Sequence, residues 1–264
     1  MAQFYSKDDT NQLNRTSPHS EALVTSGSQP SFSKRRKFLQ MAVRSAVAGF
    51  VTPAAVEFVT PSSVRAQTTL NPKMALNELI EGNKRFVAVK LTSFDLDISI
   101  LRNQTSELQQ PFAAVLACAD SRVPVELVFD QPIGQIFVTR VAGNIASSEI
   151  IASLEYGAKV LGVKAILVMG HSSCGAVEAA IPAKKVPGQI SALYPHIQPA
   201  VDLAGPDVDA TAKANASIQA GLLRKASTAI SGLIKERKLL VRAAFYNIAS
   251  GEVSLLPLDT DNSD

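Results

Sequence analysis

Residues 112–124 of this chain read FAAVLACADSRVP, and this stretch joins a strand signal to a cluster of reactive side chains. Its first seven residues form a continuous apolar run introduced by Pro111, which is typical of a strand buried on both faces. The run ends at Cys118, and the polar part that follows contains Asp120 and Arg122. Because ligands bind at the carboxyl ends of strands in open α/β sheets, we expect the chemistry of this protein to lie there.

Further segments of the same kind follow along the chain. Residues 136–140 and 165–170 are two more apolar runs, and the stretches 123–129 and 147–161 between the runs have helical character. This alternation predicts an α/β fold, in which a parallel sheet carries helices on its faces. The remaining predicted elements are an amphipathic helix from Pro72 to about Lys90, helices over 189–204 and 209–236, and a terminal hairpin with strands at 240–248 and 252–256.

The composition limits the class of protein. The chain has 264 residues, of which 46% are hydrophobic and 19% charged, and this is too apolar for a disordered protein. It also lacks the long uninterrupted apolar runs of a polytopic membrane protein. The formal net charge is +3, without the dense basic clustering that nucleic-acid binding requires, so we expect no nucleic-acid partner.

The N-terminal part of the chain has the pattern of an export signal. Residues 1–33 are polar and without periodicity. They precede the sequence KRRKFL at 34–39 and a moderately apolar stretch at 41–59. This arrangement resembles a twin-arginine signal, and VRA at 64–66 has the spacing of a signal-peptidase site.

This signal divides the chain in two. We expect a disordered leader and twin-arginine signal over 1–66 and a globular domain over 67–264, exported to a periplasm or thylakoid lumen. A cytosolic disordered tail with a chance arginine pair is one alternative, and an uncleaved signal that tethers the protein to a membrane is another. The leader holds 8 basic and 4 acidic residues, so the domain keeps 18 and 19 and has a formal net charge of −1.

Two cysteines and a histidine fall at predicted strand ends. Cys118 ends the first strand, and His171 and Cys174 lie just past the third, on a turn that leads into a helix. If these strands are neighbours, the three side chains can bind one ion, and their chemistry suits tetrahedral Zn²⁺ with a fourth position open. A disulfide or two buried thiols are the alternatives. We expect no ligand at His19, in the leader, or at His196, in a proline-flanked helical stretch.

Asp120 and Arg122 form a second informative pair. An aspartate two residues beyond a zinc ligand can occupy the fourth metal position, or it can turn away and accept a hydrogen bond from a zinc-bound water. A bidentate pair with Arg122 would hold Asp120 off the metal and keep it ionised. An ordinary surface ion pair in a loop is the alternative.

Three motifs, in this order and spacing, resemble those of the β-class carbonic anhydrases. They are Cys-x-Asp-x-Arg at 118–122, RVAGN at 140–144 and His-x-x-Cys-Gly at 171–175. The stretch EGNKRF at 81–86 also resembles the N-terminal region of that family, and the similarity spans about residues 73–256. The resemblance implies a mostly parallel sheet in strand order 2-1-3-4, extended by an antiparallel C-terminal strand.

The resemblance also implies a function. It implies a zinc enzyme that hydrates CO₂ to bicarbonate, with one Zn²⁺ per subunit held by Cys118, His171 and Cys174. Asp120 and Arg122 would be the catalytic pair, and a zinc-bound hydroxide the nucleophile, since zinc lowers the pKa of its bound water. The family's active sites lie at a subunit interface, which implies a homodimer or higher homo-oligomer. Membrane association would arise only from an uncleaved signal.

The same residues leave two other functions open. A hydrolase of a CO₂ analogue such as carbon disulfide would keep every residue named above and differ in how substrate reaches the zinc. A non-catalytic, zinc-stabilised interaction module would keep the metal ligands. The Asp120 and Arg122 pair argues against such a module, because a structural zinc prefers four permanent ligands.

One position departs from the family pattern. Some members have a second, regulatory bicarbonate pocket that uses a tryptophan three residues before the first zinc cysteine, where this chain has Val115. We therefore expect no such pocket and an open, water-bound zinc at rest, although Arg140 and Tyr246 stand at positions suited to other members of the pocket. We expect Arg140 and Asn144 to support the site or an interface rather than to bind metal.

Overall fold

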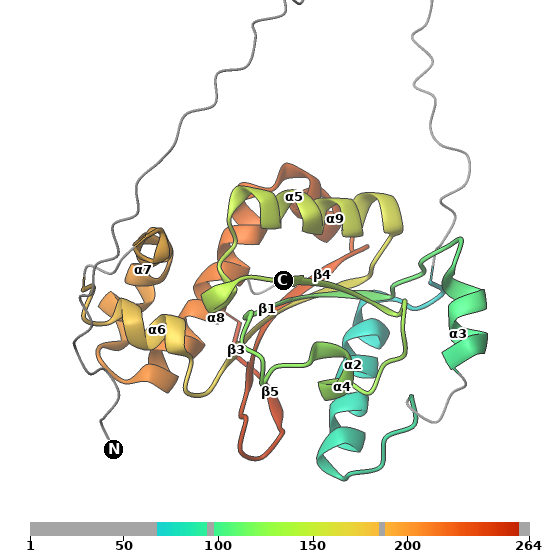
Figure 1. The fold of residues 1–264 in the computed structure, drawn as a ribbon. Helices are drawn as coiled ribbons and strands as arrows, with labels where there is room; N and C mark the ends of the chain where they lie inside the picture. Colours follow the sequence, from blue (N-terminus) through green and yellow to red (C-terminus); the bar gives the residue numbers. More distant parts are fainter. Residues whose placement is uncertain (1–67, 94–97, 185–187, 259–264) are drawn as a thin grey trace, which may run out of the picture. The chain divides into compact units, whose positions relative to one another are not determined.

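The domain is built on one five-stranded sheet (Figure 1). The structure is a computed structural model that describes residues 68–93, 98–184 and 188–258, so the predicted leader over 1–66 lies outside the described residues. The strands are β1 (Ala113–Ala117), β2 (Ile136–Arg140), β3 (Ala165–His171), β4 (Leu240–Tyr246) and β5 (Val253–Leu255). Their order is β2-β1-β3-β4-β5, with β5 antiparallel to β4 and the other pairs parallel. The predicted α/β fold and strand order are confirmed.

The central strands are buried along their whole length. All five residues of β1 and all seven of β3 are buried, which explains their continuous apolar runs in the sequence. Ala117 of β1 lies opposite Arg140 of β2 on one side and Met169 of β3 on the other. The segments that follow these three strands therefore leave the sheet at one edge, where the predicted ligands lie.

Helices cover both faces of the sheet (Figure 1). The helices of the described residues are α2 (Pro72–Val87), α3 (Ile98–Thr105), α4 (Val125–Val128), α5 (Ser148–Tyr156), α6 (Gly175–Ala180), α7 (Tyr194–Ala204), α8 (Val208–Ala226) and α9 (Thr228–Lys235), with the short helical turns η1 (Ala142–Asn144), η2 (Gly157–Leu161) and η3 (Ile190–Leu193). Alternate residues of β1 and β3 pack against α2 and α4 on one face. The intervening residues pack against α5, α8 and α9 on the other, as the two-residue period of a strand requires.

The segment predicted as one helix over 209–236 forms two helices, because Ser227 interrupts it. Ser227 has an extended backbone, and its Oγ accepts a hydrogen bond from the Ile230 N–H at 3.0 Å as the N-cap of α9. The same hydroxyl donates to Glu155 Oε1 at 2.6 Å, which ties the break to α5. The prediction of a single helix was therefore wrong at this residue.

Other differences concern helix bounds. The first helix ends at Val87 rather than near Lys90, and α4 is a single turn inside the predicted 123–129. The sequence did not predict α3. The predicted helix over 147–161 is present as α5 continued by the π-helical turn η2, and that over 189–204 as η3 and α7. The terminal hairpin is confirmed.

The C-terminal hairpin is joined to α2 through the buried side chain of Asn83. Its Nδ2 donates to the carbonyl oxygens of Val128 at 3.1 Å and Gly251 at 2.9 Å. Its Oδ1 accepts from the Val253 N–H at 2.8 Å, so both polar atoms of this amide have partners in the interior. Gly251 has a φ of +76°, and a Cβ there would lie 2.9 Å from the Phe86 ring. Helix α2 and the hairpin formed by β4 and β5 are therefore in close contact.

The carboxylate of Asp130 is fully buried and holds the segment that follows α2. Arg85 Nε donates to it at 2.5 Å, and the N–H and hydroxyl groups of Thr92 and Ser93 donate at 2.7 to 3.1 Å. Burial raises the pKa of this carboxyl, but Arg85, Ser93 and Thr92 together lower it more, so the pKa lies well below its usual range. Asp130 is thus an anchor that depends on its charge.

Replacing this anchor, Asp130→Asn, should lower the free energy of unfolding by about 2 kcal/mol near pH 7, because five donors lose an ionised acceptor. An unfolded aspartate titrates near pH 3.9. The higher free energy of unfolding of the wild type is therefore fully present above about pH 5. It decreases as the pH falls further, toward the lower pKa of Asp130 in the folded state.

Urea unfolding of both proteins near pH 7 and at about pH 3 measures this difference. Glu81→Gln removes an exposed ion pair with Lys84 and serves as the control, with little expected effect at either pH. If the difference in unfolding free energy between Asp130→Asn and the wild type stays constant from neutral to acidic pH, the charge of Asp130 does not stabilise the fold.

Candidate metal centre

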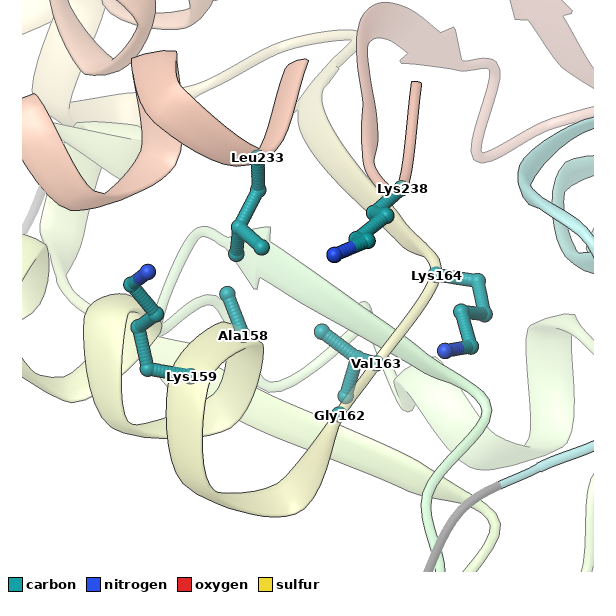
Figure 2. Close-up of a pocket in the computed structure, with 7 residues that line it drawn as sticks. All are labelled: Ala158, Lys159, Gly162, Val163, Lys164, Leu233 and Lys238. Atoms are coloured by element: carbon teal, nitrogen blue, oxygen red, sulfur yellow. The ribbon is translucent and has the colours of Figure 1, made fainter. Parts of the chain in front are cut away.

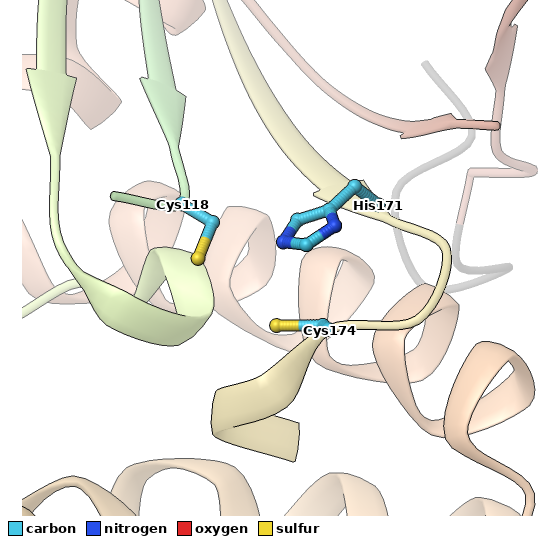
Figure 3. A group of neighbouring side chains, drawn as sticks. All are labelled: Cys118, His171 and Cys174. Carbon is cyan, nitrogen blue, oxygen red and sulfur yellow. The ribbon is translucent and has the colours of Figure 1, made fainter. Parts of the chain in front are cut away.

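Three predicted ligands meet where β1 and β3 end (Figure 3). The ligand atoms of Cys118, His171 and Cys174 all lie within 4.8 Å of one another, and all three residues are buried. Cys118 directly follows β1, His171 is the last residue of β3, and Cys174 precedes α6. Both cysteines are free thiols. The parallel pairing of β1 with β3 therefore brings together residues that lie more than 50 positions apart in the sequence.

The orientation of the His171 ring fits a metal ion. Its Nδ1 lies 2.9 Å from the carbonyl oxygen of Ser172, which can only accept, so Nδ1 carries the proton. Its Nε2 is buried without a hydrogen-bond partner and therefore presents a lone pair. Figure 3 shows one ring nitrogen pointing toward the two sulfur atoms. A buried lone pair beside two thiols is a donor set that suits zinc.

The two thiols are electrostatically coupled. A hydrogen bond with Cys174 lowers the pKa of the Cys118 thiol, assisted by His171 and by the Gly143 N–H, although burial acts in the opposite direction. The same hydrogen bond, together with burial, raises the pKa of Cys174. The two sulfur atoms therefore influence each other's ionisation directly, and a bound cation would displace thiol protons from this pair.

Asp120 lies beside the three ligands, and Arg122 binds both of its oxygens. Arg122 Nε donates to Oδ1 at 3.0 Å and Nη2 to Oδ2 at 2.7 Å, while Oδ1 also accepts from the Arg122 N–H at 2.9 Å. These bonds, against some desolvation, hold the pKa of Asp120 well below its usual range. Oδ2 lies 3.9 Å from Nε2 of His171. The carboxylate is thus ionised and turned toward its guanidinium partner.

A second arginine fixes the backbone of the same loop. Arg140 Nε donates to the carbonyl oxygen of Cys118 at 2.9 Å and Nη2 to that of Asp120 at 2.5 Å, which agrees with its expected supporting role. Tyr246 is buried on β4 opposite His171, and Val115 is fully buried in β1. In this structure Arg140 serves the ligand loop itself.

Helix α8 contributes residues that the sequence did not single out. Asp209 Oδ1 accepts a hydrogen bond from the Ser173 N–H at 2.8 Å, and Ser173 has a φ of +52° between two predicted ligands. Asn215 and Gln219 are buried on the same helix and bind the backbone of the loop after β2. Their one signal in the sequence is a spacing of four residues, continued from Thr211, on a helix face that otherwise carries alanine and leucine.

A pocket at the other end of β3 does not share these features (Figure 2). It has a volume of about 300 Å³ and lies beside Val163 and Lys164, just before the strand begins. Its polar side chains are Lys159, Lys164 and Lys238, and no cysteine, histidine or carboxylate lines it. Lys238 forms an ion pair with Glu236 at 2.8 Å. The candidate chemistry therefore stays at the opposite edge of the sheet.

Fold and site together define an α/β protein with a two-cysteine, one-histidine zinc site and an adjacent carboxylate. A family model described as carbonic anhydrase matches residues 113–253. Carbonic anhydrase 2 of Mycobacterium tuberculosis is 35% identical over 193 residues, which cover 70% of this chain and 93% of the relative. The chain belongs to the carbonic anhydrase family.

Solved structures of the β class share the fold. The β-carbonic anhydrase CcaA is 27% identical with a TM-score of 0.57, over 69% of this chain and 95% of that protein. A Coccomyxa β-carbonic anhydrase in complex with acetazolamide is 26% identical with a TM-score of 0.54, over 69% and 86%. The chain is thus a β-class member, and β-carbonic anhydrases are zinc enzymes. Neither of the two alternative functions is favoured.

The site geometry assigns different consequences to two substitutions. Cys174→Ser removes a ligand and should abolish stoichiometric zinc binding, whereas Asp120→Asn removes a charge that Arg122 holds away from the ligand group and should leave one zinc per chain. Metal analysis of the purified full-length proteins measures both. Equal zinc content in the two variants would refute this division of roles.

Proposed function

We propose that this protein catalyses the reversible hydration of CO₂ to bicarbonate and a proton at the site formed by Cys118, His171 and Cys174. The observation that carries the proposal is an ionised carboxylate, Asp120, held by two hydrogen bonds from the Arg122 side chain beside three convergent metal ligands. A bound zinc ion would supply a polarised water with a lowered pKa. The chain's own residues supply the placement of that water and of the substrate.

Asp120 acts as the acceptor that orients the attacking water. A carboxylate offers about four lone-pair sites, and the Arg122 side chain and N–H take up three of them. The remaining capacity can accept a hydrogen bond from the water and direct its lone pair at CO₂. Arg122 keeps Asp120 ionised, and its further bond to the Ser173 carbonyl at 3.1 Å fixes the guanidinium to the loop that carries His171 and Cys174.

Stopped-flow measurement of CO₂ hydration by the zinc-loaded full chain tests this proposal. We expect activity to rise from neutral to mildly alkaline pH, because two thiolates reduce the positive charge that polarises the water. Asp120 stays ionised across that range and adds no further titration. Asp120→Asn should lower the rate by about 100-fold, the usual size of an acid–base contribution, with zinc retained. A flat pH profile, or no hydration at all, would contradict the proposal.

We also propose that residues 1–66 are a leader with a twin-arginine signal and that residues 67–264 are the mature domain in a periplasm or thylakoid lumen. Support comes from the KRRKFL sequence at 34–39, the apolar stretch at 41–59 and the signal-peptidase spacing at 64–66. The first helix of the domain begins at Pro72, just past that sequence. Among the described residues, no helix has the length and apolar character to cross a membrane.

Replacing the arginine pair, Arg35→Lys with Arg36→Lys, should block export, because the pathway recognises these two residues. In a bacterium with an active twin-arginine system, the wild-type chain should appear in the periplasmic fraction in a shortened form, and the double variant should remain full-length in the cytoplasm. Export of the double variant at the wild-type level would refute the signal.

We infer further that the protein is a homodimer or higher homo-oligomer with one zinc per subunit. Strand β2 has β1 as its single neighbour among the described strands and leaves one edge without a partner, next to the loop that supports Cys118. Large apolar side chains such as Ile133 and Tyr156 are exposed near this strand and on α5. Sedimentation equilibrium should give at least twice the mass of one chain, and a monomer would contradict the inference.

A further inference from the structure

Helix α8 carries two buried amide side chains behind the candidate metal centre. Asn215 and Gln219 are one helical turn apart and are 0% and 2% exposed. Gln219 Oε1 accepts from the Ala146 N–H at 2.9 Å, and its Nε2 donates to the His196 carbonyl at 2.9 Å and to Asn215 Oδ1 at 3.1 Å. Asn215 Nδ2 then donates to the Gly143 carbonyl at 2.7 Å. The two amides form a continuous chain of hydrogen bonds.

This chain can run in one direction only. The Ala146 N–H is a donor, so the oxygen of Gln219 must face it, and the Gln219 nitrogen must then face Asn215. The oxygen of Asn215 is thereby directed at Gln219 and its nitrogen at the Gly143 carbonyl. Turning either amide over would oppose two donors or two acceptors in the interior, which is costly. The orientation of Asn215 is therefore fixed from outside the metal centre.

The chain of bonds ends at a residue that contacts a metal ligand. The Gly143 N–H donates to Cys118 Sγ at 3.3 Å. Gly143 has a φ of +74°, and a Cβ there would lie 2.8 Å from Ile197 Cδ1, so glycine is needed for this approach. Asn215 holds the carbonyl on the other side of the Gly143 Cα. It thereby stabilises the backbone conformation in which the N–H points at the sulfur.

We propose that Asn215 and Gln219 are positioning residues for the Cys118 thiolate as a metal ligand. A hydrogen bond from an amide to a ligating sulfur fixes its direction and draws charge from it, and both effects alter the strength of the metal–sulfur bond. Asn215 binds Gly143 directly, whereas Gln219 acts through Asn215. Replacing Asn215 should therefore alter the metal–sulfur bond more than replacing Gln219 does. The inference rests on the proposed zinc site and not on the reaction carried out there.

Zinc affinity and the spectrum of the cobalt-substituted full chain test this role. Asn215→Asp keeps the size of the side chain but places an oxygen against the Gly143 carbonyl, so the Gly143 N–H should turn away from the sulfur. We expect zinc affinity, measured by chelator competition, to fall about tenfold. The thiolate-to-cobalt charge-transfer band should shift. A folded Asn215→Asp protein with wild-type affinity and a wild-type band would overturn the proposal.

Thr211→Val is the matched control. Thr211 is fully buried one turn earlier on the same helix, and its hydroxyl donates to the Gly205 carbonyl at 2.8 Å, away from the chain that ends at Cys118. This variant should lose stability without a change in zinc affinity or in the cobalt band. If it changed both as much as Asn215→Asp does, the amides would have only a general structural role and the proposal would fail.

A second variant covers the case in which Asn215→Asp does not fold. Gln219→Met has a similar size and leaves the Asn215 bond to Gly143 in place without its orienting partner, so both readouts should change in the same direction and by less. No change in either readout would overturn the proposal.

Both measurements concern metal binding, so they separate this inference from the proposed activity. A zinc-loaded wild type that does not hydrate CO₂ would refute the activity alone. An active wild type accompanied by an unaltered Asn215→Asp site would refute the positioning role alone.

Discussion

The parallel pairing of β1 with β3 is the constraint on which the candidate site depends. The pairing places Ala117 opposite Met169, so the residues that follow both strands emerge at the same level of one edge. A shift of the register by one residue would move Cys118 by about 3.3 Å and turn its side chain to the other face of the sheet. The pairing that forms the core therefore also brings the metal ligands together, and the contacts around them refine their positions.

Two arginines hold the loop after β1 in complementary ways. Arg140 binds the carbonyl oxygens of Cys118 and Asp120 and so fixes the path of the backbone. Arg122 binds the Asp120 carboxylate and also the Ser173 carbonyl, which links this loop to the one after β3. A planar guanidinium can form several hydrogen bonds in fixed directions, and a lysine could not replace either one with the same effect. Both ligand loops are therefore tied to each other as well as to the sheet.

The sequence predicted what depends on short-range pattern. The buried strands were recognisable from continuous apolar runs, and the ligand set from a cysteine and a histidine placed at predicted strand ends. The break at Ser227 and the role of Asn215 were not predictable, since Glu155 and Gly143, the groups they bind, are each 72 residues away in the chain. A buried polar residue on a helix shows that a partner must exist, but its spacing does not identify that partner.

The contacts of Asn83 constrain the order in which the domain can fold. This residue lies in the first helix, but two of its hydrogen bonds are to Gly251 and Val253, 168 and 170 residues later in the chain. Until that hairpin is in place, the Asn83 amide has only the Val128 carbonyl as a partner, and its Oδ1 has none in the apolar interface that α2 enters. The N-terminal half of the domain therefore cannot complete its packing before residues 251–253 are available to pair with Asn83.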